Sequence, residues 1–255
     1  MKNTKKIALK ILAGVVAVVF IGGILFITNA FVGNPISASF ADKAIKQYAE
    51  KNYSFLDFEI EKVSYNFKDG TYIAMAKSKK SIDTKFAIYY RGGEVLRDNY
   101  DSNVLSMFNT LQRLSDEYSS VAKTLVSKEL GFVNNTTRVM YDKDEYENAK
   151  DILKLDMKFD KALPINAEVT IRLDLTDNSL EGIAKVLTDA HKVFVDNDCN
   201  FNKYDLDAEN DGMLVMVNGV TSADIESGEL TNLLEKAKNN DSVSGIRVFI
   251  KGENK

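Results

Sequence analysis

A long apolar stretch near the N-terminus constrains this chain more than any other feature of its sequence. Every residue from Ile11 to Ile27 is apolar or glycine. With its neighbours back to Ile7 and on to Thr28, the stretch reaches about 22 residues, and a helix rising ~1.5 Å per residue then crosses the roughly 30 Å of a bilayer's hydrocarbon core. We therefore expect residues 1–33 to form a short tail and a transmembrane helix.

The charges that flank this stretch predict its orientation. Lysine occurs at positions 2, 5, 6 and 10, and the first acidic residue is Asp42. Because positive charge favours the cytoplasmic side, we expect a single-pass protein of the cell membrane, with a cytoplasmic N-terminus and residues 34–255 outside. A cleaved signal peptide is the alternative, since Thr28-Asn29-Ala30 loosely resembles a cleavage site. The apolar run is longer than that of most signal peptides, which favours the uncleaved anchor.

The charge balance and the scarce residue types exclude several classes of function. The chain has 33 Lys+Arg and 37 Asp+Glu; without the four N-terminal lysines, 29 basic residues remain with 37 acidic ones, a net charge of −8. A surface of this charge gains nothing from contact with phosphates, so we expect no binding of nucleic acid. The single Cys excludes a disulfide framework and a cysteine-based zinc cluster within the chain.

The segment 34–101 has the pattern of a small α+β domain. Gly33-Asn34-Pro35-Ile36 ends the membrane span and begins a new helix, because Pro is tolerated in a first helical turn. That helix, over 37–52, places six residues on one stripe: Phe40, Ala41, Ala44, Ile45, Tyr48 and Ala49. Alternating patterns and turns at Asp69-Gly70 and Gly92-Gly93 predict an antiparallel meander with a bulge in its first strand, the strands covering 57–67, 71–79, 83–91 and 94–98.

A strongly periodic segment follows this first domain. Apolar residues recur every three or four positions over 102–131, which predicts one long connecting helix. Asp101 or Ser102 would cap its start, and Gly131 fits the position just after its end. A helix of this length either bridges two domains or packs against both.

The remainder of the chain divides into an irregular segment and a regular domain. Residues 132–164 are expected to form a linker or a surface hairpin, with a loop at 134–137 and an alternating stretch at 154–160 that would suit an edge strand. Residues 165–255 show strand and helix patterns in the order β-α-β-β-α-β, which is typical of the split βαβ, or ferredoxin-like, fold. The expected elements are strands at 167–175, 201–207, 213–220 and 245–251 and helices at 179–196 and 222–240. The predicted fold class is α+β.

The usual catalytic residues are scarce. Cys199 follows the only histidine, His191, by eight positions, and no known sequence signature joins the two. His191 borders the apolar stripe of its helix, so a packed histidine is favoured over a catalytic base. For Cys199 a small, semi-buried structural residue is favoured. Acidic residues are so numerous that the sequence alone does not single out a catalytic pair of carboxylates. No glycine-rich phosphate loop is present.

An acidic run offers a second candidate site. Asp205, Asp207, Glu209 and Asp211 alternate before a glycine, as the first ligands of a calcium loop do. With Asp207 in the first loop position, however, the twelfth position holds Asn218 and not the bidentate glutamate. A solvated hairpin tip is therefore favoured, and a weak extracellular calcium site is the alternative.

Five tyrosines fall in the first domain. Packing between neighbouring strands is the favoured role for these tyrosines, and a surface that binds a peptide or glycan is the alternative. Because Tyr89 and Tyr90 are adjacent, their side chains must point to opposite sides of a strand. The set is Tyr65, Tyr72, Tyr89, Tyr90 and Tyr100.

Two short motifs resemble a known family. Gly33-Asn34-Pro35-Ile36 and the hairpin Tyr65-Asn66-Phe67-Lys68-Asp69-Gly70-Thr71-Tyr72 are similar to the YfjL-like family of small single-pass envelope proteins from Gram-positive bacteria. The resemblance implies an N-terminal module paired with a distinct C-terminal one over nearly the whole chain. The family has no assigned activity, so the resemblance transfers no catalytic residue.

These observations favour a non-enzymatic, membrane-anchored binding or regulatory protein of the bacterial cell envelope, which contacts the lipid bilayer and an envelope protein partner. We assign no catalytic, cofactor-binding or metal-binding residue and expect no cofactor. The alternatives are a carboxylate-dependent envelope hydrolase, which needs two acids about 5–10 Å apart in a cleft, and a weak extracellular calcium-binding module.

Overall fold

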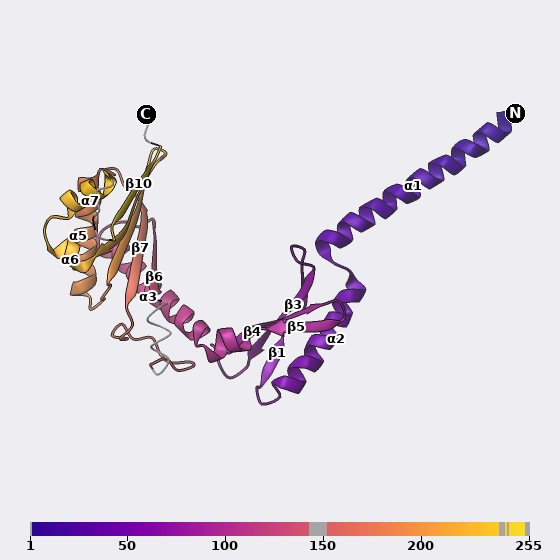
Figure 1. The fold of residues 1–255 in the computed structure, drawn as a ribbon, viewed down its shortest axis with the longest axis horizontal. Coiled ribbons are helices and arrows are strands. Elements are labelled where there is room, and N and C mark those ends of the chain that lie inside the picture. Colours follow the sequence, from indigo (N-terminus) through magenta and orange to yellow (C-terminus); the bar gives the residue numbers. More distant parts are fainter. Residues whose placement is uncertain (1, 143–151, 240–242, 244, 253–255) are drawn as a thin grey trace. The chain divides into compact units, whose positions relative to one another are not determined.

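The computed structural model describes residues 2–142, 152–239, 243 and 245–252 (Figure 1). The chain divides into two compact units, Met1–Ser106 and Met107–Lys255. Each unit combines helices with an antiparallel or mixed sheet and has its own hydrophobic core. The α+β class predicted from the sequence is confirmed.

The first unit begins with a long exposed helix, α1 (Lys2–Val32). An 18-residue window within it has a mean hydropathy of 2.8, and none of that window is buried against protein. By length and composition the helix is able to cross a bilayer, as predicted, and a signal sequence would satisfy the same criteria.

The turn that follows α1 has the geometry expected from its sequence. Gly33 has φ +79°, a left-handed conformation that glycine adopts without strain. The Asn34 side chain caps the next helix, α2 (Pro35–Asn52), by accepting the N–H of Ile36 at 2.8 Å. Proline then occupies the first turn, where its missing N–H leaves no helical bond unmade.

Helix α2 packs on a five-stranded antiparallel sheet. Ala41, Ile45 and Ala49, spaced by one turn, are fully buried against it. Phe40, predicted on the same stripe, is instead 63% exposed, because it lies to one side of the narrow stripe that Ala41, Ile45 and Ala49 form at four-residue spacing. The strands follow the order β1-β3-β4-β5, with β2 also on β3: β1 (Phe58–Ile60), β2 (Ser64–Asn66), β3 (Thr71–Ser78), β4 (Lys85–Arg91) and β5 (Glu94–Asp98).

The strand predicted over 57–67 is two short strands, not one bulged strand. Both β1 and β2 pair with β3, at opposite ends of it, and regular pairing is interrupted at residues 61–63, where the Glu61 N–H still donates to the Met75 carbonyl oxygen at 2.8 Å. The slip in the alternating apolar pattern of 57–67 therefore marks the point where regular pairing with β3 is interrupted.

The single helix predicted over 102–131 is wrong. A π-helical turn, η1 (Asp101–Leu105), is followed by Met107 in a left-handed conformation with φ +61°, and only then by α3 (Phe108–Glu129). The N-cap residues of η1 and α3, Tyr100 and Met107, make no side-chain capping hydrogen bond of their own. Val104 is buried in the first core, whereas Leu111 is buried in the second. The apolar residues of one continuous sequence pattern thus belong to two different cores. The boundary between the two units lies at Met107, where the helix is interrupted.

The second unit has a five-stranded sheet in the order β10-β9-β8-β7-β6. Its strands are β6 (Asn135–Tyr141), β7 (Ala167–Asp174), β8 (Lys203–Asn210), β9 (Met213–Thr221) and β10 (Arg247–Lys251). Its helices after α3 are α5 (Leu180–Asp196), α6 (Ser222–Glu226) and α7 (Leu230–Lys238). The helix predicted over 222–240 is interrupted at Gly228, which has φ +73°.

The prediction for 132–164 also needs correction. Of the residues predicted as a loop at 134–137, the last three belong to β6, an edge strand that pairs with β7, and 154–160 contain no strand. The outer edge of β6 is held by α3, since the Ser119 hydroxyl accepts the N–H of Val139 at 2.8 Å and lies 3.3 Å from its carbonyl oxygen. The polar stretch 143–151 lies outside the described residues.

The ferredoxin-like arrangement is not found. In a split βαβ unit another strand separates the two parallel strands. Here β7 and β8 pair directly and in parallel, with Val169 opposite Tyr204 and Ile171 opposite Leu206. The element order was predicted correctly, but the order of elements along a chain does not fix which strands become neighbours.

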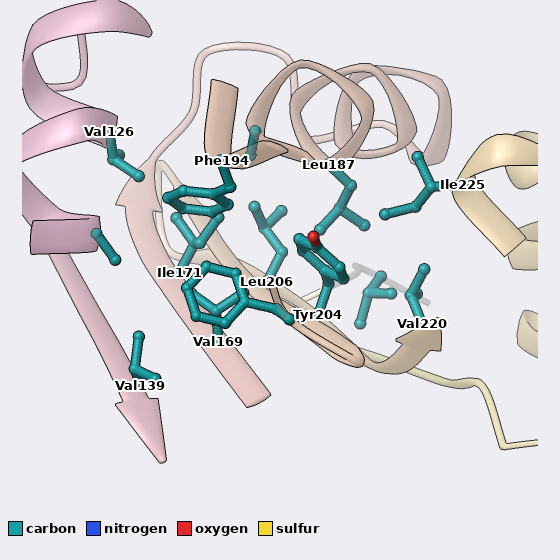
Figure 2. Packing of buried hydrophobic residues seen from close by; sticks show 14 of the residues in the cluster. Val126, Val139, Val169, Ile171, Leu187, Phe194, Tyr204, Leu206, Val220 and Ile225 are labelled. Atoms are coloured by element: carbon teal, nitrogen blue, oxygen red, sulfur yellow. The ribbon is translucent and has the colours of Figure 1, made fainter. Parts of the chain in front are cut away.

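The core of the second unit lies between one face of this sheet and its helices. Figure 2 shows α3 and α5 above the strands, with Val139, Ile171 and Leu206 pointing up toward Val126 and Leu187. Helices α6 and α7 contribute to the same core. Every helix that the structure describes in this unit therefore packs on one face, and the other face of the sheet is left to face outward.

Candidate functional site

The outward face of the second sheet, which we call the open face, carries many charged side chains. The register aligns Thr136, Arg172, Asp207, Met216 and Phe249 in one row across all five strands. Because side chains alternate along a strand, the open face also takes residues two or four positions away along the strands. These include Arg138, Met140, Glu168, Thr170, Lys203, Asp205, Glu209, Leu214 and Lys251.

Two carboxyl groups on neighbouring strands form a hydrogen-bonded pair on this face. Burial, and then the hydrogen bond and negative charge of Asp205, raise the pKa of Glu168 to about 7. Lys203, on the strand beside Glu168, opposes this increase, and Asp142 adds to it. Glu168 therefore holds a proton that it can exchange near neutral pH.

A β-bulge positions the second carboxyl of the pair. The register between β8 and β9 shifts at Asp205, and its Oδ1 accepts the N–H of Gly219 at 2.7 Å. Gly219 has φ +77°, and a Cβ at this position would lie 2.3 Å from the carbonyl oxygen of Gly245. Only glycine fits both the left-handed backbone and the close approach to Gly245. The Gly219 N–H is therefore held in a fixed place, and it positions the Asp205 carboxylate that accepts from it.

An ion pair lies further along the same two strands, on the same face. Arg172 donates to Asp207 Oδ2 from Nη2 at 2.6 Å and from Nε at 3.1 Å. Asp207 is only 6% exposed, so its carboxylate needs this partner. The open face therefore combines paired charges with exposed apolar side chains, of which Met140 and Phe249 are the largest.

The acidic run, favoured as a solvated hairpin tip with a calcium loop as the alternative, does not have the geometry of a calcium loop. Asp205, Asp207 and Glu209 lie on β8, and only Asp211 belongs to a turn, with φ +46°. The Asp207 carboxylate forms an ion pair with Arg172, and the Asp205 carboxylate accepts the N–H of Gly219. Among the residues described, no three acidic, His or Cys side chains converge as a metal site would require. The acidic run is a strand and its hairpin tip.

His191 and Cys199 are separate packing residues. His191 Nδ1 lies 2.7 Å from the Tyr204 hydroxyl, and Nε2 lies 3.3 Å from Glu226 Oε1. Cys199 is fully buried, deeper than predicted, and burial raises the pKa of its thiol. The structure pairs His191 with a tyrosine and a glutamate, and a buried thiol of raised pKa is a poor nucleophile.

The tyrosines of the first unit pack as predicted. Tyr65 and Tyr72 are cross-strand neighbours with ring centroids 5.0 Å apart, and Tyr100 lies 5.1 Å from Phe86. Tyr90 is buried, while Tyr89 points to the other side and carries the Arg97 guanidinium 4.2 Å above its ring.

One cluster in the first unit was missed from the sequence. The hydroxyls of Tyr48 and Tyr53 both donate to Asp98 Oδ2, at 2.6 and 2.8 Å. The hydrogen bond to Asp98 and burial raise the pKa of Tyr48 to about 12. This cluster fastens α2 to β5. It has no local sequence signal, because the partners lie about 50 positions apart in the chain.

Comparison with protein families agrees with this division of the chain. The model described as YfjL-like, N-terminal domain, matches residues 8–99, and the YfjL-like C-terminal domain matches 117–235. The chain belongs to the YfjL-like family. Along the sequence, the two matches are separated by residues 100–116, and the boundary between the two units at Met107 lies within this segment. The N-terminal YfjL-like domain includes most of α1 together with the first sheet, and the open face lies in the C-terminal one. No curated protein and no solved structure matched the chain.

Proposed function

We propose that this YfjL-like protein is a single-pass, membrane-anchored binding module of the bacterial cell envelope without enzymatic activity. Helix α1 is its anchor, and both units lie on the extracytoplasmic side. The exposed apolar α1 and the lysines at its N-terminal end support the anchor and its orientation. The open face is the proposed binding surface.

The observation that carries the binding role is that one sheet face holds charges and apolar side chains together. Met140 is 68% and Phe249 55% exposed, and between them lie the Arg172–Asp207 ion pair and the Glu168–Asp205 carboxyls. Protein–protein interfaces combine exposed apolar side chains with charged and polar groups, and this face offers both. The proposed partner is therefore an envelope protein with apolar and charged groups of its own.

Site-specific photo-crosslinking tests the binding surface. The full chain, expressed in its native membrane with p-benzoylphenylalanine in place of Met140, is irradiated, purified and identified by mass spectrometry. We expect one partner protein to crosslink. The matched control carries the same group in place of Lys192, an exposed residue of α5 on the helical side of the unit. Equal crosslinking from both positions, or none from Met140, would contradict the proposal.

The orientation has a separate test because the chain has one cysteine and it is buried. Lys68→Cys and Lys5→Cys variants are treated with a membrane-impermeant maleimide in intact cells. We expect labelling of Lys68→Cys alone, and labelling of Lys5→Cys after lysis. Recovery of a chain that lacks its first residues would show that the N-terminal segment is a cleaved signal peptide.

A carboxylate-dependent hydrolase is the second candidate. It is favoured by Glu168, since a carboxyl with a pKa of about 7 suits general acid or base catalysis at neutral pH. The two carboxyls bond to each other directly, so they would act as a proton-sharing pair and not on opposite sides of a substrate. Hydrolysis of envelope glycans or peptides that is abolished by Glu168→Gln would establish this function in place of binding.

A further inference from the structure

The first unit carries an exposed apolar patch at the place where α1 ends. This junction patch consists of Phe31 in α1, Ile36 and Phe40 in α2, and Phe67 in the turn between β2 and β3. Their side chains are 61%, 68%, 63% and 54% exposed, respectively. Ile36 and Phe40 lie four positions apart and so share one side of α2. All four large apolar side chains are exposed within the stretch where α1 gives way to α2 and the β2–β3 turn, and exposed apolar side chains of this size favour a surface that binds something.

Contacts within the unit fix this patch beside the end of the anchor. The rings of Phe31 and Phe67 lie 5.7 Å apart, which places the β2–β3 turn against the last turn of α1. Gly33 packs so closely on Tyr65 that a Cβ would lie 2.6 Å from its ring. The Asn34 N–H donates to the Tyr72 hydroxyl at 2.8 Å. The chain that leaves α1 is thus held directly against the sheet.

We propose that the junction patch inserts into the boundary layer of the same bilayer leaflet from which α1 emerges, so that the first unit rests on the membrane surface. This inference rests on the proposed role of α1 as an uncleaved anchor. The bilayer is the occupant because Phe31 belongs to the spanning helix itself, which makes the patch continuous with a surface already in lipid. Lys68, exposed beside Phe67, is placed to reach the headgroups with its long side chain.

The absence of tryptophan from the sequence makes a clean optical test available. Phe67→Trp and Phe40→Trp variants of the full chain are reconstituted in phosphatidylcholine vesicles, with and without lipids brominated along their acyl chains. Two matched variants serve as references. Phe20→Trp reports the middle of α1, and Phe55→Trp, 70% exposed, reports the far end of α2, about 27 Å from its start at ~1.5 Å per residue.

We expect the Phe67→Trp and Phe40→Trp fluorescence to be quenched by the brominated lipids and shifted to shorter wavelength, and the Phe55→Trp fluorescence to be unaffected. If Phe20→Trp is quenched but Phe67→Trp and Phe40→Trp behave like Phe55→Trp, the patch does not enter the bilayer and this inference is overturned while the anchor stands. If Phe20→Trp is not quenched either, α1 is not in the membrane and the proposed function itself fails.

Discussion

At the scale of single residues, Glu168 makes stability depend on pH. Its pKa is raised in the folded chain from the ordinary 4.5 to about 7, so the folded state holds a proton that the unfolded state has already released. The stability that Glu168 contributes is therefore fully present below about pH 4.5 and is lost as pH rises through about 7. Glu168→Gln removes the titration, and we expect it to stabilise the second unit by on the order of 2 kcal/mol at pH 8. Thermal unfolding of both chains from pH 4 to 8 checks this.

The control for that measurement is Glu209→Gln, which removes an exposed carboxylate from the same strand. We expect it to leave the pH dependence as it is in the parent chain. If Glu168→Gln and Glu209→Gln shift the unfolding temperature equally at every pH, Glu168 is not the residue that titrates.

The Asp98 cluster gives a second prediction at this scale. Asp98→Ala leaves two tyrosine hydroxyls without the carboxylate that accepts from both, and we expect it to destabilise the first unit by about 2 kcal/mol. Glu94→Ala, which removes an exposed acid from the same strand, should change stability by less than about 0.5 kcal/mol. Urea denaturation of the three chains compares the effects, and similar losses in both variants would show that the cluster does not stabilise the fold.

At the scale of secondary-structure elements, the bulge in β9 depends on one glycine. Gly219→Ala forces a Cβ against the Gly245 carbonyl oxygen at a left-handed backbone position, so we expect a loss of more than about 2 kcal/mol. Gly212→Ala is the matched control, because Gly212 has φ +82° and nothing within 4 Å of an added Cβ. The difference between the melting temperatures of the two variants measures the cost of the close approach of the added Cβ to Gly245. Equal losses of stability in both variants would contradict this role of Gly219.

Elements were predictable from the sequence where one local signal decided them. Asn34-Pro35 gave the start of α2, and the alternation after Ala167 gave β7, because capping and period act over a few residues. The break at Met107 and the direct pairing of β7 with β8 were not predictable, since both depend on which core a side chain reaches. The Glu168–Asp205 pair was missed for the same reason: its members are 37 positions apart, and only the sheet register brings them together.

At the scale of the whole molecule, two separate cores predict two separate unfolding transitions. Ile45 is buried in the first core and Leu206 in the second, and both are fully buried. We expect Ile45→Ala to lower only one transition and Leu206→Ala only the other, each by about 3 kcal/mol. Differential scanning calorimetry of the full chain checks this. If either substitution moves both transitions together, the units unfold as one cooperative body.

The Ser119 hydroxyl on α3 carries a consequence for chains crowded side by side in a membrane. It occupies the N–H of Val139 at the outer edge of β6, where a strand from another copy would otherwise add to the sheet. With α1 anchoring the chain as proposed, neighbouring copies share one plane, and this hydrogen bond closes one position of the edge to strand addition between them.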